Sequence, residues 1–150
     1  MYKGYLTDVP GVRVGHFEDH DAMTGASVII FEDGAVGGVD VRGSAPGTRE
    51  TDLFDEKKMM DKINAIVLAG GSAFGLDAAG GVMKYLEENN MGFDTGVCKV
   101  PIVASAVIFD LGLGNPHIRP DLNMGYLASK NSNNKDYRQG NVGAGAGASV

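Results

Sequence analysis

The stretch AIVLAGGSAFGLD, residues 65–77, decides the fold class of this chain. Its first five residues form a short continuous apolar run, which is typical of a buried β-strand. A Gly-Gly-Ser turn at residues 70–72 follows, and the pattern from about residue 73 to residue 89 predicts a helix. This order aims backbone N–H groups and the positive end of the helix at whatever lies above the turn.

The segments upstream of this unit predict strands and one hairpin. Residues 12–16 alternate between apolar and other residues, as a half-buried strand does. Two runs rich in β-branched or small apolar residues, 26–31 and 35–41, predict further strands. Glu32-Asp33-Gly34 between them predicts a tight hairpin turn, because Asp-Gly accepts the positive φ that such turns need.

The remaining segments predict two helices and one more strand. Thr51 or Asp52 caps a predicted helix that runs to about Lys62. Residues 102–109 predict a strand, with helix as the rival interpretation, and Pro120 begins a predicted helix to about Ser129. The polar stretch 130–140 predicts an exposed loop. Two strand–helix units and one hairpin together predict a mixed sheet in a single domain of the α/β (α+β) class.

Composition narrows the classes of partner. The 150 residues carry a net charge of −6 with a pI near 4.9, and no run of basic residues exceeds Lys57-Lys58. A nucleic-acid partner needs a basic face, and an anionic membrane attracts basic segments, so we expect neither. The sequence shows no apolar stretch near 20 residues, no apolar N-terminal region of a signal peptide, and Cys98 as its single cysteine. These features predict a cytoplasmic protein.

Glycine is the compositional outlier, with 23 residues in 150 against a usual share of roughly 7%. The glycines stand between apolar segments, which predicts tight turns and close backbone approaches. Gly80 and Gly81 lie inside a predicted helix, where each costs about 1 kcal/mol relative to Ala. Close packing of that helix onto a sheet or another helix is the expected compensation.

Ser72 is the first candidate for chemistry, and three interpretations of it stay open. It is the N-cap of its helix, a ligand-facing hydroxyl, or a nucleophile. A nucleophile elbow reads G-x-S-x-G, and here Phe74 stands where the second glycine belongs. The helix cap is the favoured interpretation.

Three other polar or glycine-rich stretches have competing interpretations. The loop GSAPGTRETD, residues 43–52, binds a charged substrate end through Arg49, or it is a surface turn with solvated charges. The stretch HFEDHD, residues 16–21, offers metal-binding side chains, but a polar loop is favoured and we expect no metal. Gly143, Gly145 and Ala148 fit a dinucleotide fingerprint, yet a polar loop precedes them, so tight backbone packing is favoured. We expect no cofactor.

Five blocks in a fixed order carry a resemblance to a known family. They span nearly the whole chain: TDVPGVRVGH (7–16), GAVGGVDVRGSAPGTRETD (34–52), AIVLAGGSAFGLDAAGGVMKYLEE (65–88), VPIVASAVIFDLGLG (100–114) and GNVGAGAGAS (140–149). In this order they closely resemble the L-aminopeptidase/D-esterase family, whose relatives include β-aminopeptidases and nylon-oligomer hydrolases.

The resemblance implies a fold and an activity. The implied fold is an αββα sandwich like that of N-terminal-nucleophile hydrolases, and the implied activity is hydrolysis of N-terminal residues from small peptides, amino-acid amides or esters. In the family the precursor cuts itself before a Ser or Thr, which becomes the nucleophile, and an asparagine helps to hold the oxyanion. Members assemble as homo-oligomers.

The resemblance places the catalytic residues outside this chain. The nucleophile and the oxyanion asparagine are expected beyond Val150, so residues 1–150 are expected to be the N-terminal part of one hydrolase domain, inactive without a missing C-terminal segment. Five residues remain as substrate-pocket candidates: Tyr126, Ser72, Gly71, Arg49 and Ser105, the last standing where some relatives carry a glutamate. A non-catalytic assembly or binding domain and an anion-binding domain that uses the glycine turn are the alternatives.

Overall fold

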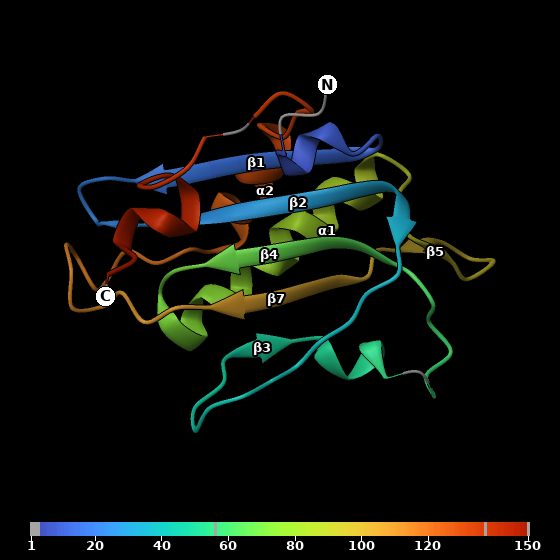
Figure 1. Cartoon of the computed structure of the whole chain (residues 1–150), viewed down its shortest axis with the longest axis horizontal. Coiled ribbons are helices and arrows are strands. Elements are labelled where there is room, and N and C mark those ends of the chain that lie inside the picture. Colours follow the sequence, from blue (N-terminus) through green and yellow to red (C-terminus); the bar gives the residue numbers. More distant parts are fainter. Residues whose placement is uncertain (1–3, 56, 137, 150) are drawn as a thin grey trace.

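One mixed sheet organises the protein, as a computed structural model shows for residues 4–55, 57–136 and 138–149 (Figure 1). The strand order is β1-β2-β4-β7-β3. The strands are β1 (Val12–Asp19), β2 (Thr24–Ala35), β3 (Thr48–Arg49), β4 (Ile63–Ala69) and β7 (Val103–Val107). A separate two-stranded ribbon pairs β5 (Phe93–Asp94) with β6 (Lys99–Val100). The sheet confirms the predicted α/β class with a mixed sheet.

The pairing directions explain the mixture. β1 and β2 form an antiparallel hairpin, β2 and β4 are antiparallel, and β3 runs antiparallel to β7. Only β4 and β7 are parallel, with Ala65 opposite Val103 and Ala69 opposite Val107. A parallel pair needs a crossover connection, and here it contains a helix, as in a β-α-β unit.

Two helices cover one face of the sheet. α1 (Ala78–Glu88) packs on β4 and β7, and α2 (Leu122–Lys130) packs on β1 and β2. Both lie behind the strands in Figure 1. The core between the helices and the sheet is apolar and fully enclosed; its large members include Ile30, Val67, Val82, Leu86 and Val103.

Glycines let the two helices approach closely. A Cβ at Gly81 would overlap the backbone oxygen of Leu122, and a Cβ at Gly125 would overlap that of Ala78. The predicted compensation for helical glycine is therefore confirmed for Gly81. Gly80 only meets Leu122, at 3.8 Å, which is ordinary contact.

Short 3₁₀ turns complete the chain. They are η1 (Leu6–Asp8), η2 (Thr51–Phe54), η3 (Ser72–Asp77) and η4 (Gly143–Gly147). η4 is buried and packs against β1 and β2, where a Cβ at Gly143 would overlap Ser27 Oγ. The prediction of tight backbone packing for this stretch is confirmed. A 3₁₀ turn also does not provide the helix that a dinucleotide fingerprint requires.

The predicted hairpin at Glu32-Asp33-Gly34 is wrong. β2 continues through these residues to Ala35, which pairs with Ile63 of β4 after an irregularity in register. Gly34 has a φ of +70°, so the Asp-Gly preference is used within an irregular strand and not in a turn. The hairpin of β2 lies at its other end, before Thr24, where Met23 has a φ of +55°. Residues 36–41 belong to no strand.

The predicted helix from Thr51 to Lys62 is also wrong beyond Phe54. Only η2 is helical, and Glu50, at its start, has a left-handed φ of +60°. Met59, one of the apolar positions of the predicted helix, is 81% exposed and not buried on a helix face.

Other segments follow the predictions closely or need small corrections. β4, β7 and α2 occupy the predicted places, and Asp121 caps α2 by accepting from Met124 N. The predicted polar loop at 16–21 is wrong for residues 16–19, which lie in β1. In the predicted exposed loop 130–140, Ser132 is buried and Asn133 pairs with Val14. Within the described part of the chain, no helix has the length and apolar character to cross a membrane.

Candidate functional site

The carboxyl ends of β4 and β7 meet at one edge of the sheet because these two strands are parallel. The glycine turn follows β4 and the segment 108–110 follows β7. The Ser72 N–H donates to Ile108 O and the Ile108 N–H donates to Ala69 O, both at 2.9 Å. Ligands of open α/β sheets bind outside such strand ends, which makes this edge a candidate site.

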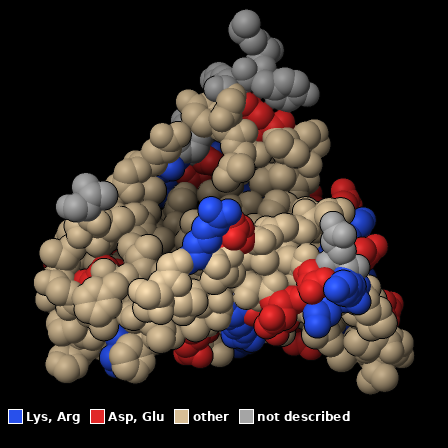
Figure 2. Space-filling model, turned by 60° about the horizontal axis from the view of Figure 1, so that its bottom comes forward, with Lys and Arg blue, Asp and Glu red and all other residues tan. Residues whose placement is uncertain are grey.

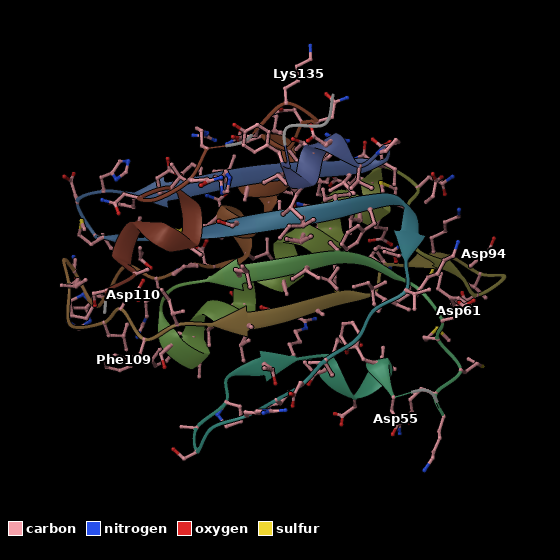
Figure 3. The ribbon with its side chains drawn as sticks, in the orientation of Figure 1. Asp55, Asp61, Asp94, Phe109, Asp110 and Lys135 are labelled. Carbon is pink, nitrogen blue, oxygen red and sulfur yellow. The ribbon has the colours of Figure 1, made fainter. Side chains whose placement is uncertain are left out.

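Asp110 fixes the glycine turn in place. Its buried carboxylate accepts from Gly71 N at 2.6 Å and from Thr24 Oγ1 at 2.7 Å. A Cβ at Gly70 would overlap the carboxylate, and one at Gly147 would lie 2.9 Å from Oδ2. Figure 3 shows Asp110 beside Phe109 at this edge of the sheet. Asp110, three residues beyond β7, thus joins the start of β2 to the glycine turn and lies against Gly147 of η4.

Ser72 is not the helix cap that its sequence context favours. The N-cap of η3 is Gly71, the cap position has no side-chain hydrogen bond, and Ser72 is the first residue of the turn. Gly71 and Ser72 have φ values of +80° and +54°. A positive φ on serine is uncommon and is held here by the backbone bonds of the turn. The ligand-facing interpretation of Gly71 and Ser72 stays a prediction.

Arg49 and Ser105 are brought together, because β3 and β7 pair them directly. Both belong to the helix-covered side of the sheet: Ser105 also pairs with Val67, and Arg49 Nη2 lies 3.2 Å from Met83 Sδ of α1. Ser105 is buried, and its Oγ has no hydrogen-bond partner among the described residues. Their roles toward a substrate stay predictions.

Tyr126 is placed apart from the other candidates. It lies on α2 and donates from its hydroxyl to Glu88 Oε2, 2.8 Å away at the end of α1. This hydrogen bond raises the pKa of Tyr126. The Tyr126 backbone lies beside Gly81 of α1, but its hydroxyl is directed toward the end of α1, whereas the glycine turn precedes the start of that helix. The five predicted pocket residues therefore do not form one cluster in this chain.

The sheet face opposite the helices carries a polar cluster. His16 Nδ1 lies 2.8 Å from Ser27 Oγ, which also accepts from Ala144 N at 3.1 Å. The Gly143 N–H donates to Glu18 Oε2 at 2.8 Å. These bonds anchor η4 to β1 and β2. Burial lowers the pKa of His16, while the carboxylate of Asp136 acts in the opposite direction.

Two cavities lie on this open face. The first, of about 310 Å³, is lined by His16, Ser27, Leu68, Arg138 and others. The second, of about 360 Å³, lies between the loop 38–48 and strands β4 and β7, and we call it the β3 cavity. Figure 2 brings the β3 edge of the sheet, the bottom of Figure 1, forward and shows a hollow with charged side chains beside it.

No metal centre is present among the described residues, since no group of three His, Cys, Asp or Glu side chains converges. Sequence reasoning missed Asp110 and Thr24. Asp110 lies in one of the five family-like blocks, but the donors to its carboxylate come from 39 and 86 residues away along the chain, and no local pattern predicts such a contact.

Comparison with known proteins defines the class. The fold resembles that of the L-aminopeptidase D-Ala-esterase/amidase from Ochrobactrum anthropi, described as a variant of the Ntn-hydrolase fold, with a TM-score of 0.73 and 16% identity over 95% of this chain and 44% of that chain. A Burkholderia β-aminopeptidase gives a TM-score of 0.67 and 23% identity over 97% and 43%. At these identities the likeness establishes the fold, and it confirms the expected resemblance of this fold to that of N-terminal-nucleophile hydrolases.

Sequence comparison gives the family. The model of peptidase family S58 matches residues 4–150, and the chain belongs to this family. It is 45% identical to an uncharacterized aminopeptidase of Mycobacterium leprae over 95% of this chain and 44% of the relative. It is 37% identical to a 6-aminohexanoate-oligomer endohydrolase of a Kocuria strain over 95% and 38%. The chain therefore spans less than half the length of these relatives.

Proposed function

We propose that this chain is the front part of an aminopeptidase or amidase/esterase that removes N-terminal residues from small peptides, amino-acid amides or esters. The observation that carries the proposal is the family match over residues 4–150, together with 45–49% identity to mycobacterial relatives that are called aminopeptidases. The polypeptide that continues this sequence to the length of those relatives is called the extended protein below.

The catalytic nucleophile belongs, in this proposal, to the part of the extended protein beyond Val150. In the described part of the chain, Ser72 forms no hydrogen bond with an imidazole, and its backbone is held in the turn by the bond from its N–H to Ile108 O. The His16–Ser27 pair is tied to η4 through Ala144. These contacts support a structural role for both serines, so the 150-residue chain alone is inactive.

The open face of the sheet is where the remainder of the extended protein packs. Leu68 is 43% exposed there, although Val67 beside it is fully buried against the helices. Exposed apolar residues and unpaired strand edges invite association, so the 150-residue chain alone is expected to form oligomers. The resemblance to the family implies a homo-oligomer for the extended protein as well. A monodisperse monomer in size-exclusion chromatography with light scattering would contradict this part of the proposal.

The test combines mass and activity. Intact mass and N-terminal sequencing of the extended protein should reveal a second fragment that begins with Ser or Thr, and the protein should hydrolyse amino-acid amides and p-nitrophenyl esters. The 150-residue chain should release no product in the same assay. An uncleaved, inactive extended protein would favour the non-catalytic alternative, and turnover by the 150-residue chain would refute the placement of the nucleophile.

A further inference from the structure

We propose that the β3 cavity binds the uncharged, apolar side chain of the substrate residue. This inference rests on the proposed function and adds the substrate class to it. The cavity of about 360 Å³ lies between the loop 38–48 and a floor formed by Ile66, Ala104 and Ala106. Its volume falls within the range of roughly 300–1,000 Å³ that small-molecule sites occupy.

Small residues create the space. Ala104 lies opposite Ile66, and Ala106 lies opposite Leu68, on the open face of the parallel pair. Ala45 and Gly47 line the loop side. The loop is held beside β7, because the Val107 N–H donates to Gly47 O at 3.0 Å, and a Cβ at Gly47 would overlap the Val107 side chain. On the other side, the Phe54 ring packs against Gly37 and holds the start of the loop.

The charges around the cavity select an uncharged occupant. Of the described residues that line it, the charged ones are Asp40 and Arg42, and they pair with each other at 2.7 Å. Both side chains are mostly exposed, at the outer rim of the loop. The hydroxyl groups of Thr48 and Thr51 are hydrogen-bonded to each other, with their oxygens 3.4 Å apart. Ser105 also belongs to the lining, and its Oγ, without a partner among the described residues, is an uncharged hydroxyl. A buried charge needs an opposite charge, and the described lining offers no unpaired one.

Exposed valines extend the apolar lining. Val39 is 48% exposed and Val41 is 44% exposed, and both line the cavity. Exposed apolar residues that gather around a concavity are typical of ligand sites. The cavity also reaches Val107, the last residue of β7, so a side chain bound here leaves the rest of its substrate near the strand-end edge that contains the glycine turn and Asp110.

The test measures selectivity in the extended protein. Wild-type kcat/KM should be at least about tenfold higher for leucine amide than for lysine amide, which carries a charged side chain. Ala106→Leu places a larger side chain in the floor and should lower kcat/KM for leucine amide at least about tenfold, while glycine amide changes by less than about threefold. Met59→Ala, at an 81% exposed position outside the cavity, is the control and should leave kcat/KM for both amides unchanged.

Each alternative gives a distinct result. Ala106→Leu could lower kcat/KM equally for leucine amide and glycine amide and also weaken assembly of the protein. That result would mean that a side chain of the remaining polypeptide fills the cavity, and it would overturn the inference. Unchanged selectivity would overturn it as well. If Ala106→Leu does not fold, Ala45→Leu fills the cavity from the loop and is judged by the same ratio. Absence of hydrolysis of every substrate by the folded wild-type protein would instead refute the proposed function, and the inference with it.

Discussion

The two faces of the sheet differ, although the same strands build them. Val67 and Leu68 are neighbours in β4; Val67 is fully buried beneath the helices, and Leu68 is 43% exposed on the other side. The helix-covered face is close-packed and apolar, whereas the open face has two cavities, a buried histidine and the anchored turn η4. The difference indicates that the first face stabilises this chain and the second is available for function.

The largest expected effect comes from a substitution in the core beneath the helix-covered face. Leu86→Ala removes a fully buried side chain between α1 and the sheet. It should lower the free energy of unfolding by about 2–5 kcal/mol, from lost burial and the cavity left behind. Urea unfolding followed by circular dichroism checks this. Met59→Ala, at an 81% exposed position, is the control and should stay within about 0.5 kcal/mol of wild type.

The second prediction concerns the strand-end edge between the two faces. Thr24→Val keeps the shape of the side chain but removes the hydroxyl that donates to the Asp110 carboxylate. The free energy of unfolding should fall by about 1.5–3 kcal/mol, since a hydrogen bond to a charged group is removed. Hydrogen exchange should also accelerate at Gly71, whose N–H donates to the same carboxylate. Unchanged exchange at Gly71 would contradict the anchoring role of Asp110.

The third prediction sharpens the contrast by overpacking. Gly125→Ala places a methyl group where the α1 backbone already lies, which should cost about 1–3 kcal/mol. Gly112→Ala is the matched control, because a Cβ there meets no atom within 4 Å. The difference in melting temperature between the two variants measures the tightness of the helix crossing. Equal melting temperatures would contradict the close approach of α1 and α2.

The smallest expected effect lies on the open face and depends on pH. Burial lowers the pKa of His16 in the folded protein relative to the unfolded chain, so the unfolded chain binds the proton more readily. His16 therefore lowers stability as pH falls below about 6.5 and through its folded pKa. His16→Gln should lose less stability than wild type between pH 7.5 and pH 5, as urea midpoints measure. His117→Gln, in an exposed turn, should retain the wild-type loss.

The sequence predicts the helix-covered half of the fold better than the site. Local signals suffice for β4, its glycine turn, β7 and α2, because each has its own apolar run or cap. They mislead at Asp33-Gly34, where pairing of Ala35 with Ile63 overrides the turn preference. They also mislead after Phe54, where no packing partner supports a helix.

The site is less accessible to sequence reasoning because long-range contacts assemble it. Asp110 meets donors from β2 and from the glycine turn, and His16 meets Ser27 across the β1–β2 hairpin. The β3 cavity forms only when a loop without regular structure settles over two alanines of β7. The sequence predicts Arg49 and Ser105 as pocket residues, but it does not place them side by side. The pairing of β3 with β7 in the structure makes them neighbours.

The most direct test compares one substitution in two contexts. Leu68→Lys changes the open face, and in the 150-residue chain it should lower the free energy of unfolding by about 1 kcal/mol or less, since a half-exposed lysine keeps its charge in water. In the extended protein the same change should cost about 3–5 kcal/mol, because the charge would be buried without a partner. An equally small cost in both proteins would contradict the claim that the open face receives the rest of the enzyme.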